Sequence, residues 1–269
     1  MSSTDRPDPL LPLEGTDNTR DIGGVAAPGG TVATGRVFRS DNLAKATAAD
    51  TAKLAELGLV VSIDFRDPYE RRSDGEDTLP TGVEALKLPI LDFDTPEVKG
   101  LVASITAGDT AALKNTLADG GTARLMTRVY EQMVTQPTAH AGFGTALTRI
   151  ANLDADMAGL YHCHSGKDRT GWMTAIVYSA LGVDRDVIFD DYLASNRYLA
   201  ASNEKLFEQV SAAGYDAELV RPFMEQRTAY LQAAFDRAEQ EYGSMDDYLT
   251  GGLGAAPATL DALRTLLIG

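Results

Sequence analysis

The chain has 269 residues, and 39 acidic against 24 basic side chains give it a formal net charge of −15 at pH 7. A surface this acidic argues against nucleic acid as a partner and is repelled by anionic lipid. No apolar stretch is long enough to span a membrane, and the N-terminus lacks a secretory signal, so we expect a cytoplasmic location by default, with signal-less secretion left open.

The first part of the chain alternates predicted strands with a helix. Residues 1–16 are acidic and proline-rich, and we expect a flexible lead-in there, followed by a single domain over residues 17–269. In chain order, the predicted elements are a strand over residues 31–40 with a turn at Gly35, a helix from the capping box Thr47–Asp50 to Gly58, and strands over residues 59–65 and 84–90.

The second part of the chain is mainly helical. Helical patterns broken by glycines run over residues 95–153 and from residue 184 to the end. Between them lie a predicted strand over residues 156–162 and a predicted helix over residues 169–181. Strands that alternate with helices predict an α/β fold, with a mostly parallel central sheet and helices on both of its faces.

The segment Tyr161–Gly171, YHCHSGKDRTG, lies between a predicted strand and a predicted helix. In it Cys163, the chain's one cysteine, precedes Arg169 by six positions, which is the spacing C-x5-R. A loop of this length can curl so that its backbone N–H groups point inward, and the start of a helix adds positive partial charge. The segment is therefore predicted to bind a phosphate group.

Each residue type in this loop has a chemical use. Arg169 can hold two phosphate oxygens with its guanidinium fork. The positive field favours the thiolate of Cys163, which can attack phosphorus in line and form a phosphocysteine. Thr170 can donate a hydrogen bond to the sulfur and ease its departure, and Gly166 permits the tight path of the loop. Such chemistry needs no metal and no cofactor, because N–H groups and Arg169 neutralise the developing charge.

Other kinds of site fit these residues poorly. A nucleotide-binding P-loop needs glycine where Tyr161 stands and serine or threonine where Asp168 stands. A single cysteine excludes an internal disulfide and the thiol relay of an arsenate reductase. Three histidines without convergent carboxylates predict no metal site.

Five stretches of the chain together resemble the bacterial tyrosine phosphatase family, which includes a secreted mycobacterial member. They are NTRDIGG (Asn18–Gly24), GRVFRSDNL (Gly35–Leu43), HCHSGKDRTG (His162–Gly171), DRDVIFDDYLASN (Asp184–Asn196) and EYGSMDDYL (Glu241–Leu249). The resemblance covers nearly the whole chain. It implies a protein-tyrosine-phosphatase-like fold and a helical lid, whose counterpart here would be the helical stretch at about residues 97–133.

The resemblance also implies roles and substrates. Cys163 would be the nucleophile and Arg169 the phosphate clamp, and Lys167, in the family's GKDR signature, would contact further phosphate groups. The family acts on phosphotyrosine, with activity toward phosphoserine, phosphothreonine and phosphoinositides. This chain departs from the family at His164 and Ser165, where a large apolar and a small residue are common, so the floor of its pocket is expected to differ.

The general acid that protonates the leaving oxygen is left open between two carboxylates. Asp168 is the favoured acid, because as part of the loop it is expected to lie beside the phosphate. The alternative for Asp168 is a carboxylate that only orients Arg20 or Arg39. Asp92 follows a strand, roughly where tyrosine phosphatases carry their acid. Arg20 is a further candidate near the phosphate. The remaining substrate-binding candidates are the loop residues His164, Ser165, Gly166 and Lys167.

The sequence therefore predicts a cysteine-dependent phosphatase that hydrolyses phosphotyrosine, with phosphoserine and phosphothreonine as further substrates. The alternative is a phosphoinositide or inositol phosphate phosphatase, which Lys167 favours and the acidic surface disfavours. A third hypothesis is a phosphate-binding module without turnover, and the joint presence of Cys163, Arg169 and Thr170 argues against it. The sequence leaves the oligomeric state open.

Overall fold

The centre of the fold is a five-stranded sheet with the order β1-β4-β7-β5-β6. The structure, a computed structural model, describes residues 8–92 and 119–268. The strands of the sheet are β1 (Arg20–Asp21), β4 (Val37–Ser40), β5 (Leu59–Asp64), β6 (Glu84–Lys87) and β7 (Ala158–His162), and a separate hairpin holds β2 (Ala26–Ala27) and β3 (Gly30–Thr31). β4, β7, β5 and β6 pair in parallel, and β1 runs antiparallel to β4. The predicted mostly parallel sheet is confirmed.

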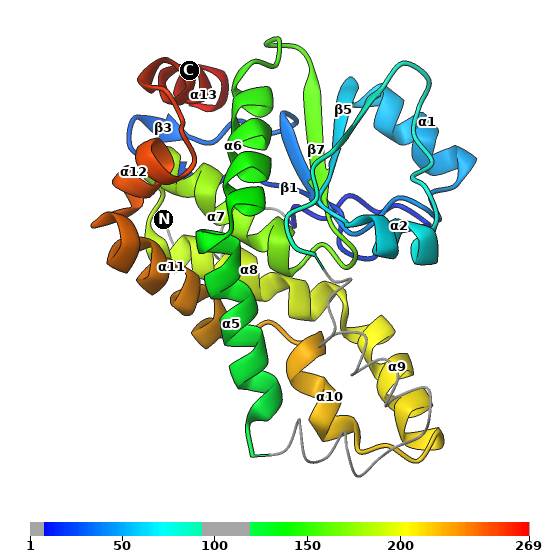
Figure 1. Ribbon diagram of the computed structural model, residues 1–269. Helices are drawn as coiled ribbons and strands as arrows, with labels where there is room; N and C mark the ends of the chain where they lie inside the picture. The colour runs from blue at the N-terminus through cyan, green and yellow to red at the C-terminus, as the bar shows by residue number, and fades with distance from the viewer. Residues whose placement is uncertain (1–7, 93–118, 269) are drawn as a thin grey trace.

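Helices cover both faces of this sheet (Figure 1). They are α1 (Ala48–Glu56), α2 (Pro68–Asp74), α5 (Gly121–Thr135), α6 (Pro137–Ala151), α7 (Asp168–Ala180), α8 (Arg185–Tyr198), α9 (Ala200–Ala212), α10 (Ala217–Met224), α11 (Thr228–Tyr242), α12 (Met245–Asp247) and α13 (Pro257–Leu267), with the short π-helix η2 (Tyr248–Gly252) before α13. Adjacent residues of β7 point to opposite faces: Tyr161 joins the core that contains α6 and α7, and Leu160 joins the core that contains Leu54 of α1.

Local sequence signals explain where the helices α1 and α2 begin. Thr47 and Asp50 form the predicted capping box of α1. The helix α2 was not among the predicted elements. In the structure Asp67 caps α2, Pro68 occupies its first turn, and Glu70 completes a second capping box. The pattern D-P-x-E was therefore the signal that would have found this helix.

The segment before β1 is packed against the rest of the molecule from residue 8 onward. The Leu11 N–H donates to the carbonyl of Thr19 at 2.9 Å, and Leu13 is buried in the core beside α1. Gly15 lies so close to the Lys45 carbonyl that an added Cβ would be 2.2 Å from its oxygen. The predicted flexible lead-in over residues 1–16 is therefore wrong for residues 8–16, because apolar side chains and backbone bonds hold them; residues 1–7 lie outside the described part.

The carboxyl ends of the parallel strands meet at one edge of the sheet. The last residues of β4 and β5, Ser40 and Asp64, both lie opposite His162 at the end of β7. The loops that follow these three strands therefore gather at one place, where open α/β sheets usually bind their ligands. The loop after β7 is the segment that begins with Cys163.

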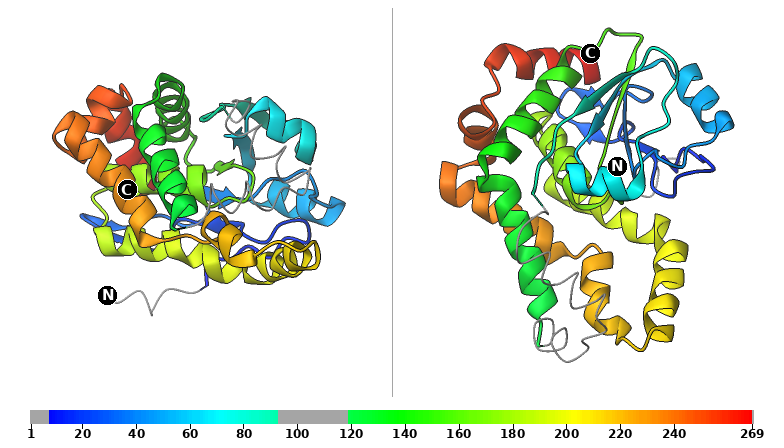
Figure 2. Two further views of the ribbon diagram at one scale, coloured as in Figure 1. Left: turned by 60° about the horizontal axis from the view of Figure 1, so that its bottom comes forward. Right: turned by 45° about the vertical axis from the view of Figure 1, so that its right-hand side comes forward.

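Helices α9 and α10 and the first half of α5 extend beyond this edge of the sheet (Figures 1 and 2). α10 packs against both α5 and α9. The predicted lid over about residues 97–133 falls only partly within the described chain, where its last part belongs to α5; residues 97–118 lie outside the described residues. Among the described residues, no helix is long and apolar enough to cross a membrane.

Candidate active site

The loop from Cys163 to Lys167 joins β7 to α7 and turns sharply at Gly166. Gly166 has a φ of +66°, which side-chain-bearing residues rarely adopt. A Cβ at this position would lie 2.4 Å from the Ser40 carbonyl oxygen. Glycine is therefore required twice over here, by the backbone conformation and by the close approach of β4.

Side chains behind the loop hold its carbonyl groups. Three successive carbonyls each accept a hydrogen bond from a side chain of another segment: His164 O from Asn42 Nδ2 at 3.0 Å, Ser165 O from Asn18 Nδ2 at 3.1 Å, and Gly166 O from the Arg39 guanidinium at 2.9 Å. In a trans peptide the N–H points opposite to the C=O. The N–H groups that follow these carbonyls consequently face away from the anchoring side chains, as an anion-binding loop requires.

The nucleophile candidate and the clamp candidate lie next to each other at the start of α7. Cys163 is buried, with 1% of its surface exposed, and Arg169 is in the first turn of the helix. Burial lowers the pKa of Arg169, but the negative charges of Glu70 and of Cys163 as thiolate outweigh burial and raise it above its ordinary value. Arg169 is thus a permanent cation beside the sulfur.

Glu70 of α2 orients this cation. Its two carboxylate oxygens accept from the two terminal nitrogens of Arg169 at 2.5 and 2.6 Å. The same carboxylate accepts the N–H of Asp67 in the capping box of α2. Because a bidentate pair fixes the plane of a guanidinium, Glu70 sets the direction in which Arg169 can offer its remaining donors. The sequence interpretation missed this role of Glu70.

A buried group of charges lies directly behind the loop. The Asp191 carboxylate of α8 is 3.3 Å from Nε of Arg20 and 2.5 Å from the guanidinium of Arg39. Both arginines are fully buried, and Arg20 also donates to Asn18. Burial and the neighbouring Arg39 lower the pKa of Arg20. The side chain of Arg20 is hydrogen-bonded to Asp191, Asn18 and Ser195 behind the loop, and its role as a substrate-binding residue stays a prediction.

Asp168 lies at the mouth of the loop and not beside those arginines. Its Oδ1 accepts from the hydroxyl of Tyr130 at 2.7 Å, and its Oδ2 lies 3.2 Å from Nζ of Lys167. The alternative in which Asp168 only orients Arg20 or Arg39 is therefore wrong, since Asp191 fills that role. Asp92 is exposed at the end of the first described range. Its role as general acid stays a prediction.

The Lys167 side chain is also engaged within the protein. Its ammonium donates to the carbonyl of Phe223 near the end of α10, and the residue is buried. α10 is thereby joined to the loop that carries Cys163. The contact of Lys167 with further phosphate groups stays a prediction and would require this bond to open.

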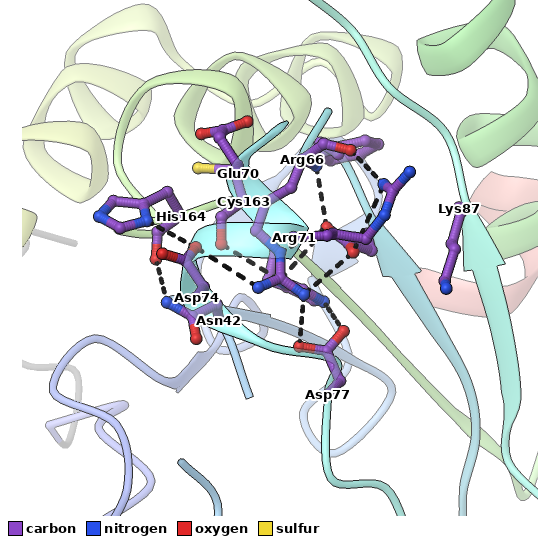
Figure 3. A network of polar contacts seen from close by, with 12 residues as sticks. Asn42, Arg66, Glu70, Arg71, Asp74, Asp77, Lys87, Cys163 and His164 are labelled. Atoms are coloured by element: carbon purple, nitrogen blue, oxygen red, sulfur yellow. Dashed lines mark hydrogen bonds and ion pairs between the residues drawn. The ribbon is translucent and has the colours of Figure 1, made fainter. Parts of the chain in front are cut away.

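Histidines flank the cysteine on two sides. His162 is fully buried, with Nε2 2.9 Å from an oxygen of Asp77. Burial lowers the pKa of His162, but the carboxylates of Asp77 and Asp64 raise it by more than burial lowers it, so the pKa lies above its ordinary value. A protonated His162 adds positive charge behind Cys163. His164 is exposed, and its imidazole lies against Asp74 of α2 at 2.7 Å (Figure 3). The substrate-binding role of His164 stays a prediction, as does that of Ser165.

The described residues contain one group that could bring metal ligands together: Asp64, Asp77 and His162. The guanidinium of Arg66 is already the cation of these carboxylates: it lies 3.0 Å from Asp64, and it lies 2.8 Å from Asp77 (Figure 3). An added divalent ion would have to displace it. This group therefore fits a structural ion-pair network better than a metal centre.

Thr170 has a hydroxyl group with a free hydrogen-bonding capacity. Its Oγ1 is buried and has no hydrogen-bond partner among the described residues. Buried hydroxyl groups usually have a partner. The expected hydrogen bond from Thr170 to the sulfur of Cys163 stays a prediction.

The chain is similar to known proteins over nearly its whole length. Residues 11–269 match the family Y_phosphatase3, described as the tyrosine phosphatase family. The chain belongs to this family. As a member it is a phosphatase, a phosphoric monoester hydrolase of the protein-tyrosine-phosphatase type.

Two relatives in this family extend along most of the chain. The triple specificity protein phosphatase PtpB of Mycobacterium tuberculosis is 31% identical over 280 residues, which cover 96% of this chain and 98% of PtpB. A Cupriavidus necator protein with a provisional tyrosine-protein phosphatase name is 32% identical over 252 residues, or 93% of this chain and 86% of that protein. The crystal structure of P. aeruginosa TpbA aligns with a TM-score of 0.34 and 15% identity, over 75% of this chain and 95% of TpbA.

Proposed function

We propose that this phosphatase hydrolyses phosphotyrosine in proteins through a phosphocysteine on Cys163, with phosphoserine and phosphothreonine as further substrates. One observation carries the proposal: three features surround the buried Cys163. They are the loop whose carbonyl groups are hydrogen-bonded to side chains behind it, the start of α7, and Arg169, which Glu70 orients. The name of PtpB, a triple specificity phosphatase, supports the wider substrate range.

The proposed reaction has two steps. The Cys163 thiolate attacks phosphorus, the bond from phosphorus to the tyrosine oxygen breaks, and Asp168 gives its proton to that oxygen. Water then attacks the phosphocysteine and gives a proton to the Asp168 carboxylate, which restores the acid, and the sulfur leaves as a thiolate that accepts a hydrogen bond from Thr170. Arg169 and the inward N–H groups hold the phosphoryl oxygens in both steps. The orphan hydroxyl of Thr170 supports its part in the second step.

A phosphoinositide phosphatase on the same loop is the less favoured alternative. Its support is Lys167, which could bind an additional phosphate group. Two observations weigh against it: the ammonium of Lys167 is committed to Phe223 and Asp168, and the net charge of −15 opposes approach to an anionic membrane.

Substrate turnover in a chelating buffer tests the proposal. We expect the protein to release phosphate from a phosphotyrosine peptide in the presence of EDTA, and to do so with a kcat/KM at least about tenfold above that for a phosphoinositide in mixed micelles, a difference of about 1.4 kcal/mol. A phosphoserine peptide of the same sequence serves as the comparison for substrate range. Dependence on added metal, or a preference for the lipid, would contradict the proposal.

The pH dependence of Asp168→Asn and Asp92→Asn assigns the general acid. The acid must carry a proton, so its loss removes the basic limb of the kcat/KM profile and leaves the acidic limb in place. We expect Asp168→Asn to lose that limb and to lower kcat/KM by roughly 10²- to 10⁴-fold. Asp92→Asn is the matched variant. If Asp92→Asn loses the limb instead, the assignment moves to Asp92.

A further inference from the structure

Tyr130 of α5 connects the loop to the helices around it. It is fully buried, and its hydroxyl oxygen lies 2.7 Å from Oδ1 of Asp168 and 2.7 Å from the hydroxyl oxygen of Tyr192. The side-chain amide of Gln226 donates to the same oxygen at 3.2 Å. Three polar groups from three other segments therefore converge on a single phenol.

The donor inventory of a phenol decides which way these bonds run. A tyrosine hydroxyl has one proton and two lone pairs. Gln226 Nε2 can only donate, so it takes one lone pair of Tyr130. The Oδ1 atom of Asp168 accepts from the Tyr130 hydroxyl, so the hydroxyl of Tyr192 donates to the second lone pair of Tyr130. With both lone pairs taken, the Tyr130 proton goes to Oδ1 of Asp168.

The other carboxyl oxygen of Asp168 faces Lys167. An ammonium has three donors and no acceptor, so it cannot receive the proton of a carboxylic acid. Among the described residues, the negative charge of Asp168 also raises the pKa of Arg169, Tyr192 and Tyr230. Since Tyr130 already donates to Oδ1, a proton carried by Asp168 must be on Oδ2.

We propose that Tyr130 is a positioning residue that fixes the rotation of the Asp168 carboxyl group and leaves Oδ2 as the oxygen that delivers the catalytic proton. This inference rests on the proposed role of Asp168 as general acid. In the step itself the Oδ2–H bond breaks, the proton goes to the ester oxygen, and the electron pair of the broken P–O bond stays on that oxygen. The carboxylate left behind keeps the bonds from Tyr130 and Lys167, which stabilise its charge.

Leaving-group dependence tests the inference with two aryl phosphates. Phenolate is a poor leaving group that needs the proton, whereas p-nitrophenolate leaves readily without it. We expect Tyr130→Phe to lower the ratio of kcat/KM for phenyl phosphate to kcat/KM for p-nitrophenyl phosphate by about tenfold, the effect of one charge-assisted hydrogen bond. The ratio is taken within one sample, so any unfolded fraction of the variant cancels.

Tyr230→Phe is the matched control. Tyr230 is buried in the same aromatic cluster, with its ring 5.8 Å from that of Tyr130, but its hydroxyl donates to the Pro222 carbonyl. Its removal is expected to leave the ratio unchanged. The variant Asp168→Asn gives the full loss of proton transfer, and its ratio is expected to fall further than that of Tyr130→Phe.

The outcomes separate the two proposals. If Asp168→Asn lowers the ratio and Tyr130→Phe behaves like Tyr230→Phe, the positioning role is overturned and Asp168 keeps its role as general acid. If Asp168→Asn leaves the ratio unchanged, both the acid assignment and the inference fall. If the ratio falls in Asp168→Asn and in Tyr130→Phe but not in Tyr230→Phe, the acid assignment and the positioning role are both supported.

Discussion

Replacement of Cys163 by serine is expected to lower kcat for p-nitrophenyl phosphate by roughly 10⁴-fold or more, as removal of an enzyme nucleophile does. The hydroxyl of serine is a far weaker acid than a thiol and stays protonated, so it cannot attack phosphorus at a useful rate. Cys163 is buried and serine is nearly isosteric, so the loop should keep its path. Activity is measured in EDTA, beside thermal unfolding of both proteins.

The Cys163→Ser variant is also expected to retain phosphate binding. The loop N–H groups, Arg169 and Glu70 remain in place, so phosphotyrosine peptide should bind the variant with an affinity close to its KM for the unaltered protein. Alkylation of cysteine gives an independent measurement of the role of Cys163, because the chain has one cysteine. An alkylating reagent should inactivate the unaltered protein with one label per chain, and phosphate should protect it. Activity that survives in Cys163→Ser would disprove the phosphocysteine mechanism.

Among the substitutions proposed for this protein, replacement of Asp191 is expected to lower the free energy of unfolding most. Asp191 is the anion between Arg20 and Arg39, and the side chains of all three are almost entirely shielded from water. Asp191→Asn keeps the shape but leaves two buried guanidinium groups without their counter-ion. Breaking a buried ion pair from one side typically costs about 3–5 kcal/mol, so we expect the free energy of unfolding to fall by about that amount.

Urea unfolding of Asp191→Asn and Asp190→Asn measures this effect. Asp190 is the exposed neighbour on the same helix, and its substitution is expected to change the free energy of unfolding by less than about 0.5 kcal/mol. Activity should fall together with stability, because Arg39 holds the Gly166 carbonyl of the loop. Equal stability of the two variants would show that the arginines are compensated by something other than Asp191.

The sequence predicted best what is encoded within a few neighbouring residues. The strand that ends at His162, the turn at Gly166 and the helix that carries Arg169 follow one another directly, so their order fixes the local geometry of the loop. The β-branched strand over residues 59–65 and the capping box at Thr47 are local in the same sense. Hydrophobic periodicity and turn chemistry act over such short distances, so they can be seen without a structure.

Partners far apart in the chain could not be predicted in this way. The roles expected of Arg20 and of Asp168 depended on which carboxylate meets Arg20 and Arg39, and the structure supplies Asp191, more than 150 positions away from either arginine. Asp191 belongs to a stretch that was recognised only as part of the family resemblance. Its spacing on α8 gives no sign that it faces two arginines from the other half of the chain.

The feature that the sequence by itself determined is the composition of the loop: a cysteine, an arginine and a glycine lie at the spacing that a phosphate-binding strand-to-helix turn requires. Only the tertiary structure decided how that loop is held. Glu70 on Arg169, Tyr130 on Asp168 and Arg39 on the Gly166 carbonyl are each brought in by the packing of separate elements. The physical reason is that loop conformation and residue type are local properties, whereas the orientation of a charged side chain depends on whichever partners the fold buries beside it.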